Sequence, residues 1–206
     1  MHCFDHHGIT AVVAGGVLQK LVREEERLGT SQQFRLDNIN TQMHEFQSHQ
    51  KPSSRMPKLR PSDLMVNDWF ELGGVLITAV NTRNCSPFVV HLAGKYFDRV
   101  GSGYDEAVVK LAKALDDLYN VIWSAGLFLN ADEMATARGA LQELGLQHMV
   151  CRKFAQDRGE FAFQIRPKAH YAQHFVEQMA LINPRHTMCY QEESLIGVVT
   201  DIYHKS

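Results

Sequence analysis

Cysteine and proline are few in this sequence, with 4 and 6 among 206 residues, while its 14 glycines are an ordinary share. The four cysteines lie far apart and form no Cys-x-x-Cys pair, which argues against a disulfide framework and against a zinc ribbon. We expect free, mostly buried thiols in a reducing compartment. The low proline content and the ordinary glycine content exclude a collagen repeat and low-complexity disorder, so the sequence predicts a globular domain.

The sequence also lacks a large excess of positive or negative side chains. The 21 Lys and Arg residues against 23 Asp and Glu residues give a formal net charge of −2, so no global positive field draws the chain onto nucleic acid. The longest near-apolar run, 9–18, is too short for a membrane-spanning helix, which needs about 20 residues. A cationic leader with a long apolar stretch is also missing. We therefore expect an intracellular protein that does not span a membrane.

A helical spacing of apolar residues runs through much of the chain. The strongest example, over 104–125, has an apolar stripe at 3.6-residue spacing, formed by Val108, Leu111, Ala112, Leu115, Leu118, Tyr119 and Ile122. Asn130 and Glu133 have the spacing of a capping box and predict a helix that reaches about Phe154. Further helices are predicted over 9–28, within 30–60, over 62–72, from Ser86 to about residue 100, over 169–181 and over 190–204.

Two features complicate this helical pattern. Gly15-Gly16 interrupts the first segment, which is either a helix or a strand that runs into a helix. A short strand is also compatible with residues 161–165. The fold class is therefore mainly α, with little or no sheet.

Residues 51–61 are the strongest linker candidate, because this segment contains three prolines, two lysines and two arginines. We predict an N-terminal helical segment over 1–50 and a main helical domain over 62–206. The linker also carries the main local basic patch, which is the first candidate for nucleic-acid binding: Lys51, Arg55, Lys58 and Arg60. The simpler interpretation is a solvated proline-rich loop, because no aromatic residues are interleaved with these cations.

Histidines and carboxylates near the C-terminal end are the second group of candidates. His170 and His174 are four residues apart, so a helix would present both imidazoles on one face. A zinc site needs a third ligand, and a zinc-peptidase motif needs a glutamate between the histidines, which this sequence lacks. Glu192 and Glu193 begin a predicted helix, where they complement the helix dipole or act as oxygen ligands for Mg²⁺.

Several segments, taken in order, resemble the later part of the catalytic region of DNA-transposon transposases with an RNase H-like core. They resemble most the transposase-related open reading frames of protist, especially dinoflagellate, genomes. The segments include CFDHHGITAVVAGGV, NTRNCSPFVVHLA, LDDLYNVIW, RPKAHYAQHF and INPRHTMCYQEESLIG. The resemblance covers nearly the whole chain and depends on the order of the segments. It implies the helical insertion and closing helices of such a core.

In that family, three carboxylates hold two metal ions that promote phosphoryl transfer. The resemblance implies that Asp5 is the second carboxylate and Glu193 the third, with Glu192 as a substitute and Mg²⁺ or Mn²⁺ as the metal. It also implies nucleic-acid contacts by Lys168 and Arg185, and it makes His170 and His174 structural or phosphate-contacting neighbours of the site. The first carboxylate would lie upstream of Met1, so we expect the chain to begin inside a larger domain.

The sequence therefore predicts a truncated or domesticated transposase-like protein that does not cleave DNA on its own. DNA, a second copy of the chain or another protein is the expected partner, and the resemblance implies a nuclear location. One alternative is a helical protein-interaction module without a catalytic role. A second alternative is a metal-binding enzyme built around His170, His174 and Glu193.

Overall fold

The computed structural model describes residues 8–52, 54–66, 68–73, 77–97, 102–166, 174–175 and 177–187. Within these ranges the fold is mainly helical, as the sequence predicts. The long helices are α1 (Ile9–Glu24), α2 (Gln32–Gln50), α3 (Ala79–Tyr96), α4 (Gly103–Ser124) and α5 (Ala131–Asp157). Residues 174–175 and 177–179, within the helix predicted over 169–181, are also helical. Short 3₁₀ turns cover Glu26–Leu28, Pro61–Leu64 and Pro184–Thr187, and strands β1 (Met65–Val66) and β2 (Trp69–Phe70) form an antiparallel pair.

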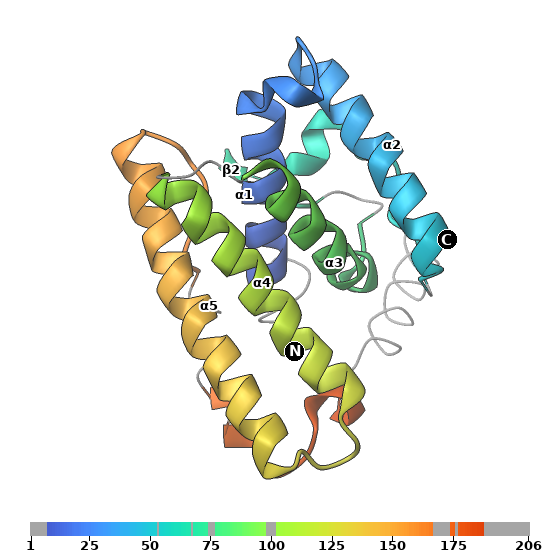
Figure 1. Cartoon of the computed structure of the whole chain (residues 1–206), viewed down its shortest axis with the longest axis vertical. Helices are drawn as coiled ribbons and strands as arrows, with labels where there is room; N and C mark the ends of the chain where they lie inside the picture. Colours follow the sequence, from blue (N-terminus) through green and yellow to red (C-terminus); the bar gives the residue numbers. More distant parts are fainter. Residues whose placement is uncertain are drawn as a thin grey trace, which may run out of the picture.

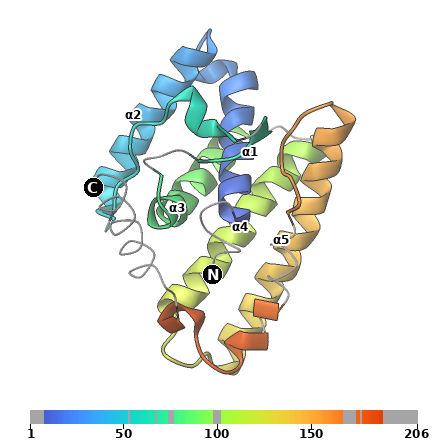
Figure 2. The same cartoon turned by 180° about the vertical axis from the view of Figure 1, so that it is seen from behind.

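Helix α1 is the centre of the fold and is buried on all sides from Ile9 to Val22. A helix that is covered all round is typical of a core element rather than a surface one. Figure 1 shows α1 behind α4 and between α2 and α5, and Figure 2 shows the same arrangement from behind. In both views α4 and α5 lie side by side as a long pair, beside the smaller group of α1, α2 and α3.

The glycine pair in α1 does not interrupt the helix, so the expected break is wrong. A Cβ atom added to Gly15 would lie 2.3 Å from the Cα of Glu71, and one added to Gly16 would lie 2.6 Å from the ring of Phe163. The N–H of Leu72 donates to the carbonyl of Ala11 at 2.8 Å, which fixes the crossing segment against the helix. The two glycines therefore serve close packing, and the rest of the core holds the helix continuous.

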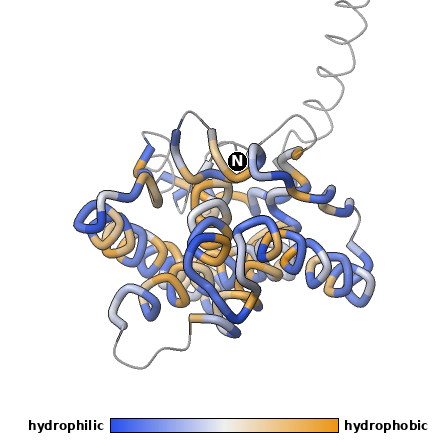
Figure 3. Tube along the Cα trace, turned by 90° about the horizontal axis from the view of Figure 1, so that it is seen from above, coloured by the Kyte–Doolittle hydropathy of each residue, from blue (hydrophilic) through white to orange (hydrophobic). Residues whose placement is uncertain are grey.

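The predictions for α2, α4 and α5 are confirmed, because their signals are local. Ser31 caps α2, and the Asn130–Glu133 capping box opens α5 as expected. The apolar stripe of α4 is buried along its length. Figure 3 shows hydrophobic and hydrophilic residues alternating along the helices, as amphipathic helices around a shared core require.

Three local predictions are wrong. Residues 62–72 form a 3₁₀ turn and the β1–β2 hairpin rather than a helix, because Pro61 begins a tight turn and Asp68 adopts a left-handed φ of 66° between the strands. Helix α3 begins at a Thr78–Asn81 capping box, so Pro87 lies inside it rather than at its start. Residues 161–165 form no strand, and Phe163 adopts a left-handed φ of 53°.

The proline-rich segment 51–61 packs against α2. Met56 and Leu59 are buried, and the side-chain amide of Asn40 bonds both the N–H and the carbonyl of Leu59. Described apolar residues before and after this segment belong to one hydrophobic cluster that extends from Ile9 to Met179. The division into 1–50, 51–61 and 62–206 stays a prediction. No helix within the described ranges has the length and apolar character that a membrane crossing requires.

Candidate functional site

A cleft of about 260 Å³ opens where the C-terminal end of α2, the first half of α3 and the second half of α4 meet. We call it the Trp123 cleft. Polar and aromatic side chains from all three helices line it, chiefly Gln47, Gln50, Arg83, Asn84, Ser86, Asp116, Asn120 and Trp123. Concave sites with a few convergent polar groups are the usual places for ligands, so this cleft is the main candidate site.

Two guanidinium groups lie around the indole of Trp123. The Cζ of Arg83 is 4.4 Å from the ring centroid, and the Cζ of Arg185 is 6.0 Å from it. Arg185 also donates from Nη1 to the carbonyl of Trp123 at 2.6 Å, while Arg83 donates from Nη2 to the Oδ1 of Asn84 at 3.0 Å. Guanidinium groups at these distances are attracted by the ring, so the cleft has a cationic and aromatic rim.

The end of α4 determines where Arg185 lies. The fully buried Asn183 donates from Nδ2 to the carbonyls of Ile122 at 2.9 Å and of Gly126 at 2.8 Å. The carbonyl of Ile122 is one that the end of α4 leaves without a helical partner, and Gly126 follows directly after the C-cap Ala125. The N–H of Arg185 in turn donates to the Oδ1 of Asn183 at 3.0 Å. One side chain therefore caps α4 and fixes Arg185 beside Trp123.

Asp116 supplies a carboxylate inside the cleft. Its two oxygens accept from the hydroxyl of Ser86 at 3.2 Å and from the Nδ2 of Asn120 at 3.1 Å. Burial raises the pKa of Asp116, hydrogen bonds from Ser86 and Asn120 oppose the rise, and the neighbouring Asp117 adds to it. A carboxylate has about four acceptor positions, so roughly two are left for a ligand.

The predicted basic patch of the linker divides into two pairs. Lys58 lies 3.2 Å from Asp37, and Arg60 lies 2.9 Å from Asp63, so both charges already have acidic partners. Hydrogen bonds from Gln33 and from Lys58 lower the pKa of Asp37. No ion pair is recorded for Lys51 or Arg55, which are both exposed, among the described residues.

The N-terminal end of segment 51–61 lies beside the Trp123 cleft. Asn84 donates to the carbonyl of Ser54 at 3.0 Å, Asn81 donates to the carbonyl of Arg55 at 2.9 Å, and Pro52 lines the cleft. Arg55 and Lys58 line a second cleft of about 560 Å³. Gln47 lines both clefts, so the two are neighbours across α2.

Most of the predicted metal site lies outside the described residues. This applies to Asp5, Glu192 and Glu193, and the predicted nucleic-acid contacts Lys168 and His170 also lie outside, so the roles of all five stay predictions. His174 is described; it is exposed, and its Nδ1 lies 3.6 Å from the carboxylate of Glu177. Among the described residues, no group of three or more His, Cys, Asp or Glu side chains could hold a metal ion.

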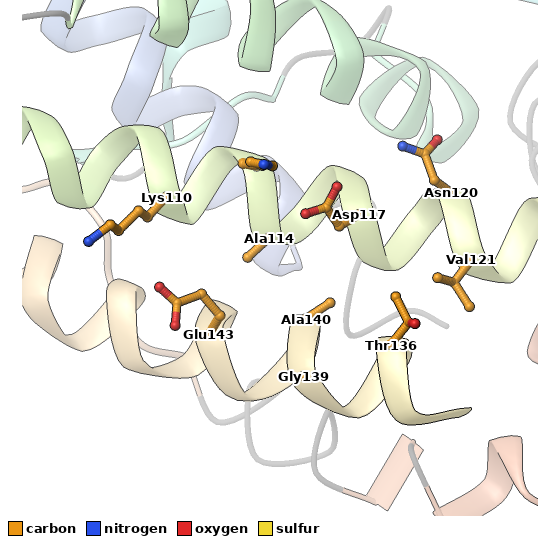
Figure 4. A pocket seen from close by; sticks show the side chains of 10 residues that line it. Lys110, Ala114, Asp117, Asn120, Val121, Thr136, Gly139, Ala140 and Glu143 are labelled. Carbon is orange, nitrogen blue, oxygen red and sulfur yellow. The ribbon is translucent and has the colours of Figure 1, made fainter. Parts of the chain in front are cut away.

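A larger groove of about 630 Å³ lies between α4 and α5. Figure 4 shows Ala114, Gly139 and Ala140 between the two helices, with Lys110 and Glu143 toward one end. Lys110 is paired with Glu106 at 2.7 Å, and that hydrogen bond raises its pKa. The groove offers a surface of small side chains with an opposite pair of charges toward one end, but fewer convergent polar groups than the Trp123 cleft.

Other buried chemistry stabilises the fold. The Nζ of Lys20, in α1, lies 2.7 Å from Glu24 of the same helix and 3.2 Å from Asp105 of α4. The ion pair with Asp105 therefore joins α1 to α4. Cys85 and Cys151 are free and buried, as expected, and burial raises the pKa of each thiol to about 12. Both thiols are therefore protonated near neutral pH and are unsuited to nucleophilic chemistry.

Arg83, Asp116 and Trp123 were not among the residues selected from the sequence. Arg83 stands in NTRNCSPFVVHLA and Trp123 ends LDDLYNVIW, two segments that carry the resemblance, but neither contains a recognisable ligand motif. What identifies this site is the packing of α3 on α4, which brings Arg83 and Trp123 together although they are 40 positions apart in the chain. Comparison of the chain with protein-family models, with curated proteins and with solved structures finds no match.

Proposed function

We propose that this chain is a transposase-like protein that binds single-stranded DNA at the Trp123 cleft without cleaving it. The observation that carries the proposal is the placement of the Arg83 and Arg185 guanidinium groups around the indole of Trp123. Proteins that bind single strands combine cationic grooves for phosphates with aromatic rings on which bases stack. The linker patch alone lacks aromatic residues, and Trp123 supplies one beside it.

The local arrangement of charge matters more here than the net charge of −2. Because Lys58 and Arg60 are already paired with acidic residues, we assign the phosphate contacts of the linker first to Lys51 and Arg55. We assign further phosphate contacts to Arg83 and Arg185 because both lie beside Trp123. The two clefts share Gln47 as a lining residue, so a strand that occupies both would cross α2 near this residue. A volume of about 260 Å³ suits a single unstacked base rather than a duplex.

Fluorescence anisotropy with a labelled oligothymidine tests the proposal. We expect Arg83→Gln and Arg185→Gln each to weaken binding several-fold. Each should also reduce the slope of log affinity against log salt by about 0.7, because one phosphate contact is lost. Lys153→Gln is the matched control, since it removes a charge near the C-terminal end of α5, on an element that does not line the cleft. Equal affinity for all four proteins would contradict the proposed site.

A second candidate function is protein interaction, which one surface favours. Leu127, Phe128 and Leu181 are exposed where the α4–α5 turn meets the segment before Arg185. The N–H of Asn183 donates to the carbonyl of Leu127 at 2.8 Å and holds the two segments together. Exposed apolar side chains that gather in this way are typical of interaction sites. Sedimentation of the wild type and of Phe128→Ser over a range of concentrations would show whether the surface drives self-association.

A further inference from the structure

We infer that the Trp123 cleft selects guanine, with the carboxylate of Asp116 accepting hydrogen bonds from the base. This inference rests on the proposed function, because it names the base that a bound single strand inserts. The bases of the rest of the strand would remain outside, where the cationic rim contacts their phosphates.

The free acceptor positions of Asp116 are the first argument. Ser86 and Asn120 each occupy one position on a different carboxylate oxygen, so each oxygen retains roughly one acceptor position. The Watson–Crick edge of guanine carries two adjacent N–H donors, at N1 and N2, which match the two oxygens of a carboxylate. Cytosine and adenine place one amino group beside an acceptor nitrogen, and thymine has one N–H between two carbonyls. A carboxylate therefore distinguishes guanine from the other three bases.

The distribution of charge determines which part of a nucleotide enters. Asp116 lines the cleft and bonds the buried Ser86, whereas Arg185, which lies beside Trp123, is exposed and is not one of the lining residues. A carboxylate in this position repels a phosphate, and the guanidinium groups attract it. The most favourable orientation therefore places the base inside and the sugar-phosphate at the rim.

Gln47 adds a donor on the wall of the same cleft. Its side chain is buried, with 5% of the residue exposed, and its Nε2 has no hydrogen-bond partner among the described residues. An unpaired buried donor is unfavourable, and a ligand carbonyl would satisfy it. Guanine presents O6 next to its N1 donor. Because the Nε2 atom is sealed from solvent, this contact requires the Gln47 side chain to rotate toward the cleft.

The experiment compares short oligothymidines that carry one central dG, dC, dA or dT. Trp69→Phe leaves Trp123 as the sole tryptophan, so quenching of its emission reports occupancy of this cleft alone. We expect the dG strand to bind about tenfold more tightly than the dT strand. Replacing dG by deoxyinosine, which lacks the N2 amino group, should remove most of that preference without any change in the protein.

Two variants locate the preference on the protein. Asp116→Asn keeps the shape of the side chain but replaces one acceptor oxygen with a donor, so the preference for dG should disappear. Asp117→Asn is the matched control, because Asp117 lines the α4–α5 groove instead of the cleft and should leave the preference intact. Thermal melting confirms that both variants fold.

The possible failures are distinguishable. Equal affinity for all four strands would overturn the selection of guanine and leave the proposed DNA binding in place. A preference for dG that survives both Asp116→Asn and deoxyinosine would overturn the role of Asp116. Absence of binding to every strand, with Trp123 emission unchanged, would overturn the proposed function itself.

Discussion

Gly15 of α1 lies directly against the backbone of Glu71, so that a Cβ atom at this position would come within 2.3 Å of the Glu71 Cα. The contact joins the buried central helix to the segment that follows β2. Glu71 is itself fully buried, and its carboxylate pairs with Arg166. The N-terminal helix, the hairpin and the segment after α5 therefore meet at one point.

Gly15→Ala should destabilise the protein by about 1–3 kcal/mol, because an added methyl group must displace backbone rather than a flexible side chain. Urea denaturation of the two proteins measures the change. Gly139→Ala is the matched control: Gly139 is inside α5, and an added Cβ there meets nothing within 4 Å. That substitution should stabilise by about 0.5–1 kcal/mol through helix propensity. A neutral Gly15→Ala would contradict the close packing.

The free energy of unfolding should fall as the pH is lowered from about 6.5 to about 4, because His148 is buried. Burial lowers the pKa of His148 from 6.5 to about 4. The unfolded chain therefore binds a proton at His148 before the folded chain does, which costs about 3 kcal/mol of stability by the lower end of this range.

His148→Gln should flatten that part of the pH dependence, as measured by urea denaturation at several pH values. His44→Gln, at an exposed position of α2, is the control and should leave the slope as in the wild type. The same slope in both variants would rule out His148 as its source.

Lys20→Met should destabilise the protein by about 3–5 kcal/mol, because it leaves the buried carboxylate of Asp105 without its cation. Adding Asp105→Asn to this variant removes the uncompensated charge and should recover much of the loss. Guanidinium denaturation of the wild type, Lys20→Met, Asp105→Asn and the double variant forms a double-mutant cycle. Additive effects of the two substitutions would show that Lys20 and Asp105 do not interact.

Asn183→Ala should destabilise the protein by about 1–3 kcal/mol, because the capped carbonyls of α4 lose a buried donor. It should also weaken binding of single-stranded DNA, since Arg185 loses its attachment to Asn183. Asn183→Asp keeps the acceptor for Arg185 but removes the donor to α4. Comparing DNA affinity and melting temperature in the two variants separates the cap from the positioning of Arg185.

The predicted metal site is tested by thermal shift with Mg²⁺ and Mn²⁺. If Asp5 and Glu193 share a metal ion, either cation should raise the melting temperature, and Asp5→Ala and Glu193→Ala should each abolish the rise. A rise that persists in both variants would place the metal elsewhere. An absent rise would leave a helical module without the inherited metal chemistry.

Much of the fold could be predicted because its signals are local. The stripe of α4 and the Asn130 cap of α5 concern residues within one or two helical turns of each other, and both are confirmed. The errors occur where distant contacts outweigh local preference. Pro87 lies within α3 because the Thr78 cap and packing on α4 hold the helix around it.

The candidate site could be predicted only in part. Arg185 was selected from its segment, but its partner Trp123 lies 62 positions earlier in the chain. Arg83 and Asp116 come from different helices, and each has an ordinary local sequence. Their convergence depends on how α3 packs against α4, and the position of Arg185 depends on its hydrogen bond to Asn183.

The sequence by itself determined that this protein is mainly helical and where its most regular helices lie, because apolar spacing and capping residues act over a few positions. Only the tertiary structure decided that α1 continues through Gly15-Gly16, that Met65–Val66 pairs with Trp69–Phe70 and that Arg83, Asp116 and Trp123 line one cleft. The physical reason is the range of the interactions. A core contact between distant segments can outweigh a local preference of about 1 kcal/mol, and its partner is not visible within any short stretch of sequence.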